Sequence, residues 1–188
     1  MAMVDETGVI GSTTRKLQII LGSMAVGVAI FIGVVVFAIP GPERGGGGVP
    51  DRPGPVAALP ALSVAAYTFT AILLPLSFVI PGVVAESLRK KLAAGKFTPQ
   101  AGSSAMGDVD SLAAIYQTRT IVGAALNEAP AFLAAIAYMI ERDPIALGLA
   151  MALLGVLVAR VPTVPRAATW FDDQRARLEA DRNALRLG

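Results

Sequence analysis

Long apolar stretches separated by short polar segments form the main pattern of this chain. No residue is charged among the 22 from Leu17 to Ala38, nor among the 30 from Val56 to Ala85. A helix needs about 20 consecutive apolar residues to cross the hydrocarbon core of a bilayer. The pattern therefore predicts helices that span a membrane.

Comparing the apolar stretches with this length predicts four spans, at about 17–39, 59–84, 120–140 and 144–161. Pro40 ends the first span, and Asp143 and Pro144 suit the N-cap and the first position of the fourth. Pro75 and Pro130 lie inside the second and third spans, where each lacks a backbone N–H and predicts a kink. We expect an all-α membrane protein whose transmembrane bundle covers residues 17–161.

The Lys and Arg residues predict the orientation of this bundle. Thirteen of the 16 lie in the N-terminal tail 1–16, in the loop 85–119, or from Arg160 onwards. Cytoplasmic segments near the spans carry the excess of these residues. We therefore expect a multi-pass protein of the inner membrane with both termini in the cytoplasm. Arg160 lies in the last turn of the fourth span, from where its side chain can extend to the lipid headgroups.

The two longer loops differ in composition. The outer loop 40–58 has 11 Gly or Pro among 19 residues, which predicts a flexible tether. The inner loop 85–119 begins with a basic cluster next to a span, which is either a contact for anionic lipid headgroups or a topology determinant only. The headgroup candidates in this cluster are Arg89, Lys90, Lys91 and Lys96.

The C-terminal tail 162–188 predicts an amphipathic helix. Its apolar positions recur every seven residues, at Phe171, Leu178 and Leu185. Trp170 suits a membrane interface and is a further lipid-headgroup candidate. The helix either lies near the membrane or docks on a partner, or it is an exposed helix with internal ion pairs such as Asp173 with Arg177.

Two alternatives concern the origin of the spans. The residues 36–38 would suit a signal-peptide cleavage site, but the apolar run before them exceeds the roughly 7 to 15 residues of a signal sequence, which favours an uncleaved anchor. The first and third spans also share a faint similarity, KLQIILG against TRTIVGA, as a duplicated hairpin would produce.

The composition removes most catalytic chemistry. The chain is 54% hydrophobic and 16% charged, and it contains neither Cys nor His. Thiol nucleophiles, His bases and almost all transition-metal sites are thereby excluded. Asp108 and Asp110 form the only tight acidic pair of the inner loop, and they are better interpreted as the cap region of the third span than as a metal site. We expect no enzymatic activity, cofactor, metal or nucleic-acid partner.

Glu128 is the residue that this composition does not explain. It lies eight residues into the third span, about 12 Å from its start, where no Lys or Arg is at the same depth. Intramembrane acids by default indicate a proton or ion pathway. An unpaired carboxylate is costly to ionise there, so we expect it to donate a hydrogen bond to Thr68, Thr70 or Asn127.

Pro130 adds a second polar feature beside this acid. Its ring leaves the carbonyl of Leu126 without a helical donor, so that carbonyl, Asn127 and Glu128 together form an oxygen-rich cluster. Such a cluster holds a proton, Na⁺ or a water, or it is a structural network that fixes how the helices pack.

The stretch TRTIVGAALNEAPAFLAAIAYMI, residues 118–140, resembles the second helix of the ring-forming c subunit of rotary ATP synthases. That helix has an IIGAAL-like run, an acid at mid-membrane and an alanine-rich exit with a Tyr. The resemblance implies that Glu128 matches the ion-carrying carboxylate. The rest of the chain departs from that family, because it has four spans rather than two, and Pro130 follows the acid.

The sequence as a whole therefore predicts a non-enzymatic subunit or accessory protein of a bacterial inner membrane. The alternative is a proton- or Na⁺-handling membrane protein that uses Glu128. The expected partners are the lipid bilayer and either other membrane subunits or further copies of this chain.

Overall fold

The computed structural model describes residues 6–38, 61–97 and 107–187. These fold into helices with no strand among them, which confirms the all-α prediction. A short π-helical segment, Val34–Ala38, continues the first helix. The five α-helices are α1 (Glu6–Gly33), α2 (Ala61–Ala93), α3 (Asp108–Glu141), α4 (Pro144–Ala159) and α5 (Val164–Leu187).

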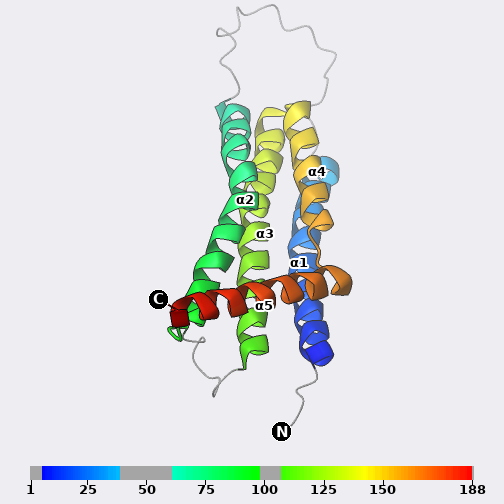
Figure 1. The fold of residues 1–188 in the computed structure, drawn as a ribbon. Coiled ribbons are helices and arrows are strands. Elements are labelled where there is room, and N and C mark those ends of the chain that lie inside the picture. The colour runs from blue at the N-terminus through cyan, green and yellow to red at the C-terminus, as the bar shows by residue number, and fades with distance from the viewer. Residues whose placement is uncertain (1–5, 39–60, 98–106, 188) are drawn as a thin grey trace, which may run out of the picture.

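Helices α1 to α4 run side by side, and α5 crosses them near the end where α3 begins (Figure 1). α3 is the central helix and contacts α1, α2 and α4. Its buried face carries mostly small side chains, which let neighbouring helices approach closely. Those alanines are Ala124, Ala131, Ala134, Ala135 and Ala137.

Three helices are long and apolar enough to cross a membrane, within Thr7–Phe37, Ala61–Ala93 and Asp108–Glu141. α4 has 16 residues and is about 24 Å long, shorter than the roughly 30 Å of the hydrocarbon core. α4 and α5 together pass the same test, with a bend of 67° between them, and they add a fourth span if the two helices are taken as one broken span. These findings support a membrane protein with three spans, or up to four.

The helices extend beyond the predicted spans. α1 begins at Glu6, α2 continues to Ala93 and α3 already begins at Asp108, so most of the described part of the predicted loop 85–119 is helical. A helix can continue beyond the hydrocarbon core, because its backbone groups stay hydrogen-bonded to one another. α2 and α3 also continue past their internal prolines. The predicted tether 40–58 lies outside the described residues.

At one end of the bundle, the α3–α4 turn is tied to the start of α2. The Glu141 carboxylate accepts hydrogen bonds from the backbone N–H groups of Leu62 and Ser63, both at 2.7 Å. Asp143 accepts one from the Tyr67 hydroxyl. Asp143 also accepts a bond from the second residue of α4 at 2.9 Å, which confirms its predicted role as N-cap.

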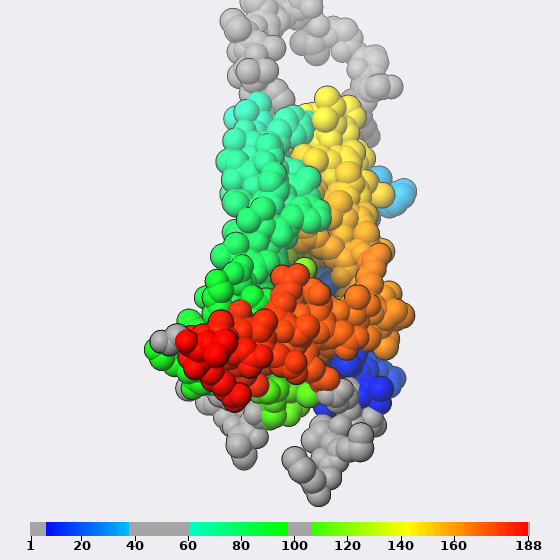
Figure 2. Space-filling view, viewed as in Figure 1, coloured from blue at the N-terminus to red at the C-terminus, as the bar shows by residue number. Residues whose placement is uncertain are grey.

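At the other end, α5 packs across the bundle instead of standing free. Figure 2 shows it, orange to red, lying against α2 and the end of α4. Its inward face consists of Ala167, Phe171, Gln174 and Leu178. The predicted apolar stripe is therefore confirmed for Phe171 and Leu178, whereas Leu185 is exposed.

Ion pairs hold α5 in this position. The guanidinium of Arg89, on α2, is buried and donates to Asp181 and to Gln174, both at 3.0 Å. Arg182 donates two hydrogen bonds to Asp108 at the start of α3, at 2.6 and 2.8 Å. The amphipathic tail thus docks on its own bundle. The predicted pair of Asp173 with Arg177, which lies along α5 itself, is also formed, at 3.1 Å.

Candidate functional site

Glu128 lies partly exposed on α3, 13 residues before the end of that helix. This places it about 20 Å from the α3–α4 turn, within the depth of a bilayer. Its neighbours Ala125 and Ala129 are exposed. Within the described ranges, no hydrogen bond or ion pair involves the Glu128 carboxylate. A carboxylate at membrane depth therefore opens partly onto the outside of the bundle.

The structure does not join Glu128 to its predicted hydrogen-bond partners. The Thr68 hydroxyl donates to the carbonyl of Val64 at 2.9 Å, and the Thr70 hydroxyl donates to that of Ala66 at 2.7 Å. Both threonine hydroxyls thus have hydrogen-bond acceptors within α2 itself. Asn127 is fully buried, and neither atom of its side-chain amide has a partner among the described residues.

The register of α2 against α3 explains part of this separation. The two helices are antiparallel, with Glu141 beside Leu62 at one end and Gly123 close to Ser77 further along. Glu128 is therefore level with the stretch 72–75 of α2. Thr68 and Thr70 lie nearer to the α3–α4 turn, by about 3 Å or more at 1.5 Å per residue.

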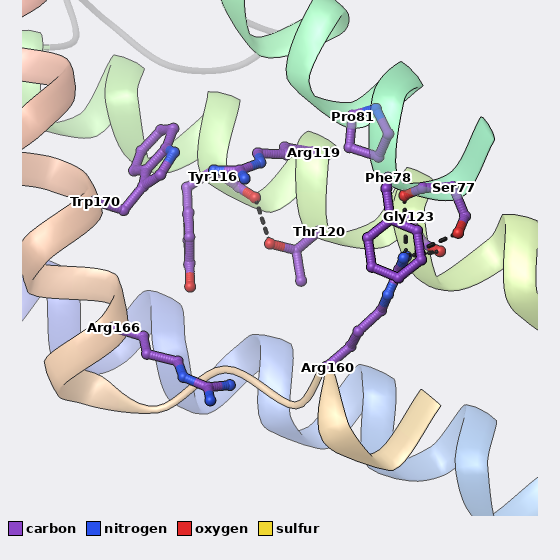
Figure 3. Close-up of a pocket in the computed structure, with 10 residues that line it drawn as sticks. All are labelled: Ser77, Phe78, Pro81, Tyr116, Arg119, Thr120, Gly123, Arg160, Arg166 and Trp170. Atoms are coloured by element: carbon purple, nitrogen blue, oxygen red, sulfur yellow. Dashed lines mark hydrogen bonds between the residues drawn. The ribbon is translucent and has the colours of Figure 1, made fainter. Parts of the chain in front are cut away.

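A second polar feature lies where α4 ends. The sequence predicts that Arg160 extends outwards from the end of its span, whereas in the structure its guanidinium turns into the bundle. One terminal nitrogen donates to the carbonyls of Gly123 (2.7 Å) and Ser77 (3.1 Å), and the other donates to the Ser77 hydroxyl (2.9 Å). The ring of Phe78 covers the guanidinium at 4.2 Å (Figure 3).

The sequence of α2 and α3 prepares this niche for Arg160. Pro81 lies four residues after Ser77 and has no N–H, so the Ser77 carbonyl lacks its helical donor and accepts from Arg160 instead. Gly123 provides the space: a Cβ there would lie 3.0 Å from the arginine nitrogen and 3.2 Å from the Pro81 ring. A proline four residues after a serine, opposite a glycine, was the signal that sequence reasoning missed.

A cavity of about 340 Å³ adjoins the niche, between α2, α3 and the start of α5 (Figure 3). Three arginines from different elements line it: Arg119 from α3, Arg160 from the end of α4 and Arg166 from α5. No carboxylate is among its lining residues. The other lining residues are Ser77, Phe78, Pro81, Tyr116, Thr120, Gly123 and Trp170.

None of these three arginines forms an ion pair within the described part of the chain. The Arg119 guanidinium lies 5.8 Å from the centre of the Trp170 ring, and Arg166 donates only a long hydrogen bond, 3.4 Å, to the carbonyl of Ala159. Other arginines of the same end do have carboxylate partners, as in the pairs of Arg89, Arg177 and Arg182. Among the described residues, no carboxylate therefore compensates the positive charge of this cavity.

The predicted lipid-headgroup residues have different surroundings. Arg89 is directed towards α5, and Lys90 pairs with Glu86 at 2.8 Å on the surface of α2. Lys91 and Lys96 are exposed. Trp170 lines the arginine cavity. Arg89 lines a neighbouring hollow together with Trp170, so two of these five residues line pockets.

No model of a known family, no curated protein and no solved structure matches the chain. Among the described residues, no group of three or more acidic side chains is placed to hold a metal ion. The two candidate functional features of the described residues are therefore Glu128 with Asn127 and the arginine cavity.

Proposed function

We propose that this chain is a four-span, non-enzymatic protein of a bacterial inner membrane, and that it works as a subunit or accessory protein of a larger membrane assembly. Both termini lie in the cytoplasm in this proposal. The observation that carries it is the carboxylate of Glu128, which is partly exposed at membrane depth without a partner in the described chain.

A carboxylate that faces lipid is unfavourable, by about 2.5–3.5 kcal/mol on insertion scales for an acid at the centre of a helix. Such groups usually face protein instead. Ala125 and Ala129 flank Glu128 on the exposed side of α3, and small residues of this kind let another helix approach closely. We infer that a membrane helix of a second chain covers this face and shares a hydrogen bond with Glu128.

The positions of charged and aromatic residues support the orientation. Arg119 lies 22 residues before Glu141 along α3, about 33 Å away, which corresponds to the thickness of the hydrocarbon core. Trp170 lies close to Arg119 and suits the interface on that side. α5 then lies along the cytoplasmic surface, where its ion pairs remain hydrated.

The number of protein chains in the native complex, measured as a mass, tests this proposal. The tagged full chain is extracted with its surrounding lipid in a polymer and weighed by native mass spectrometry. We expect particles with more than one protein chain, and we expect Glu128→Leu to shift them towards single chains. Thr68→Val is the matched control, because that hydroxyl is satisfied within its own helix. Single chains in the wild type would contradict the proposal.

A second candidate function is the handling of protons or Na⁺, and the observation that favours it is Asn127. Its side chain is fully enclosed and both polar atoms lack partners among the described residues. It adjoins Glu128, and Pro130 leaves the Leu126 carbonyl without a helical donor. An amide oxygen, a carbonyl and a carboxylate are suitable ligands for a hard cation or for a proton with its water.

Labelling and flux measurements separate this candidate from the first. If Glu128 binds ions, a hydrophobic carbodiimide labels it in a pH-dependent manner and Na⁺ or a lower pH changes the rate. Proteoliposomes with the wild type should then show flux that Glu128→Gln abolishes. A wild type without flux would exclude transport by this chain alone and leave the assembly proposal standing.

A further inference from the structure

We propose that the cavity between α2, α3 and α5 binds the phosphate group of an anionic molecule, most directly the headgroup of an anionic lipid. The proposal depends on Arg119, Arg160 and Arg166 and is independent of Glu128. Three arginines from separate parts of the chain meet in one pocket although no acid lines it.

The charge of the pocket selects an anion. Guanidinium groups bind phosphate oxygens with paired, charge-assisted hydrogen bonds. Arg119 and Arg166 retain donors for this purpose, because neither has a carboxylate partner in the described structure. Asp173 on α5 lines the neighbouring hollows and pairs with Arg177. Arg160 is held by the backbone niche and supplies a fixed positive charge.

The walls of the pocket select a molecule with an apolar part. Phe78 and Pro81 form one side, and Trp170 forms another. The volume of about 340 Å³ suffices for a headgroup with the first part of an acyl chain. Basic pockets between membrane helices on the cytoplasmic side are recognised sites for such headgroups.

The depth of the pocket agrees with this occupant. Gly123, at its inner edge, lies 18 residues before Glu141, about 27 Å along α3, and Arg119 lies one turn further. A lipid phosphate lies just beyond a hydrocarbon core of about 30 Å. Gly123, where Arg160 is held, thus lies near the edge of the core, and Arg119 lies just beyond it, level with the phosphates of one leaflet.

The chain carries its own reporter for binding. It has a single Trp, and Trp170 lines the pocket with Arg119 over its ring. A phosphate that draws Arg119 from the ring changes the surroundings of the indole. Tryptophan fluorescence therefore reports on the surroundings of Trp170, and its dependence on Arg119 and Arg166 assigns a response to this cavity.

The test uses the full chain, stripped of lipid, in a maltoside detergent. It is titrated with short-chain phosphatidylglycerol, with short-chain phosphatidylcholine and with inorganic phosphate at constant ionic strength. We expect a saturable fluorescence change with phosphatidylglycerol. The double variant Arg119→Gln/Arg166→Gln should bind at least about tenfold more weakly. The control Arg186→Gln, at the exposed end of α5, should stay within about twofold.

Each outcome has a defined meaning. A response to inorganic phosphate with the same dependence on Arg119 and Arg166 supports the phosphate site and identifies free phosphate as the ligand. A response to phosphatidylglycerol without a response to inorganic phosphate supports a lipid headgroup as the ligand. No saturable response, an equal response to phosphatidylcholine, or unchanged binding by the double variant would overturn the proposal. If circular dichroism shows that the double variant is misfolded, Arg166→Gln alone provides the test, since that side chain is exposed.

Discussion

Arg160 donates a hydrogen bond of 3.1 Å to the backbone carbonyl of Ser77, the carbonyl that Pro81 leaves without a helical donor. A side chain at the end of α4 thereby completes the hydrogen bonding of α2, and its second bond, to Gly123, includes α3. Three helices are joined by one guanidinium. The arginine cavity lies directly beside this junction.

Gly123→Ala should destabilise the bundle. The new methyl group would lie 3.0 Å from the Arg160 nitrogen and 3.2 Å from the Pro81 ring, so the guanidinium must move out of its niche. We expect a loss of about 1–3 kcal/mol in the free energy of unfolding. Gly155→Ala on α4 is the control, because nothing lies within 4 Å of the added atom, and it should be neutral or stabilising. Thermal unfolding in detergent measures both.

Pro81→Ala should make Arg160 less necessary. The backbone N–H of an alanine at position 81 can donate a hydrogen bond to the Ser77 carbonyl within α2. The loss of Arg160 then no longer leaves that carbonyl unsatisfied. In a double-mutant cycle, we expect Arg160→Gln to cost about 1 kcal/mol less in the Pro81→Ala background than in the wild type. Equal costs in both backgrounds would show that the two residues are not coupled.

The α3–α4 turn should lose stability in acid. The hydrogen bond from Tyr67 holds the pKa of Asp143 below its ordinary value of 3.8. Because the folded-state pKa is the lower one, the stabilisation is present above pH 4 and disappears as the pH falls through the folded value. Tyr67→Phe should therefore lower the melting temperature at pH 7 and make progressively less difference below pH 4. A difference that stays constant down to pH 2 would contradict this assignment.

Arg89→Met should release α5. Arg89 is 7% exposed and bonds to Asp181 and Gln174, so its loss leaves a half-buried carboxylate and a buried amide without their donor. We expect a loss of about 1–3 kcal/mol, below the value for a fully buried pair. Limited proteolysis should then cut within α5. Arg177→Met, which breaks an exposed pair on the same helix, should leave the digestion pattern unchanged.

The membrane class and the main helices could be predicted because each depends on neighbours along the chain. An apolar run determines a span, and Asp143 before Pro144 determines where α4 starts. The stripe through Phe171 and Leu178 likewise follows from spacing on one helix. The sequence could not show that this stripe faces the chain's own bundle, because docking depends on Asp108 and Arg89, which are far away in the sequence.

In the candidate site, too, the features set by neighbouring residues could be predicted and the contacts between helices could not. Glu128 was recognisable as an acid inside an apolar run. Its predicted partners were chosen by depth along separate helices, whereas depth in the bundle follows from the register of α2 against α3. The inward course of Arg160 depends on a contact between Pro81 and Gly123 on different helices. A pattern along one helix does not contain that contact.

Photo-crosslinking in intact membranes tests whether another chain covers the face of α3 that carries Glu128. A small diazirine amino acid is placed at Ala125, beside Glu128, or at Ile72, an exposed position on α2. We expect protein-sized adducts from position 125, which Glu128→Leu reduces, and lipid adducts alone from position 72. Lipid adducts alone from both positions would contradict it.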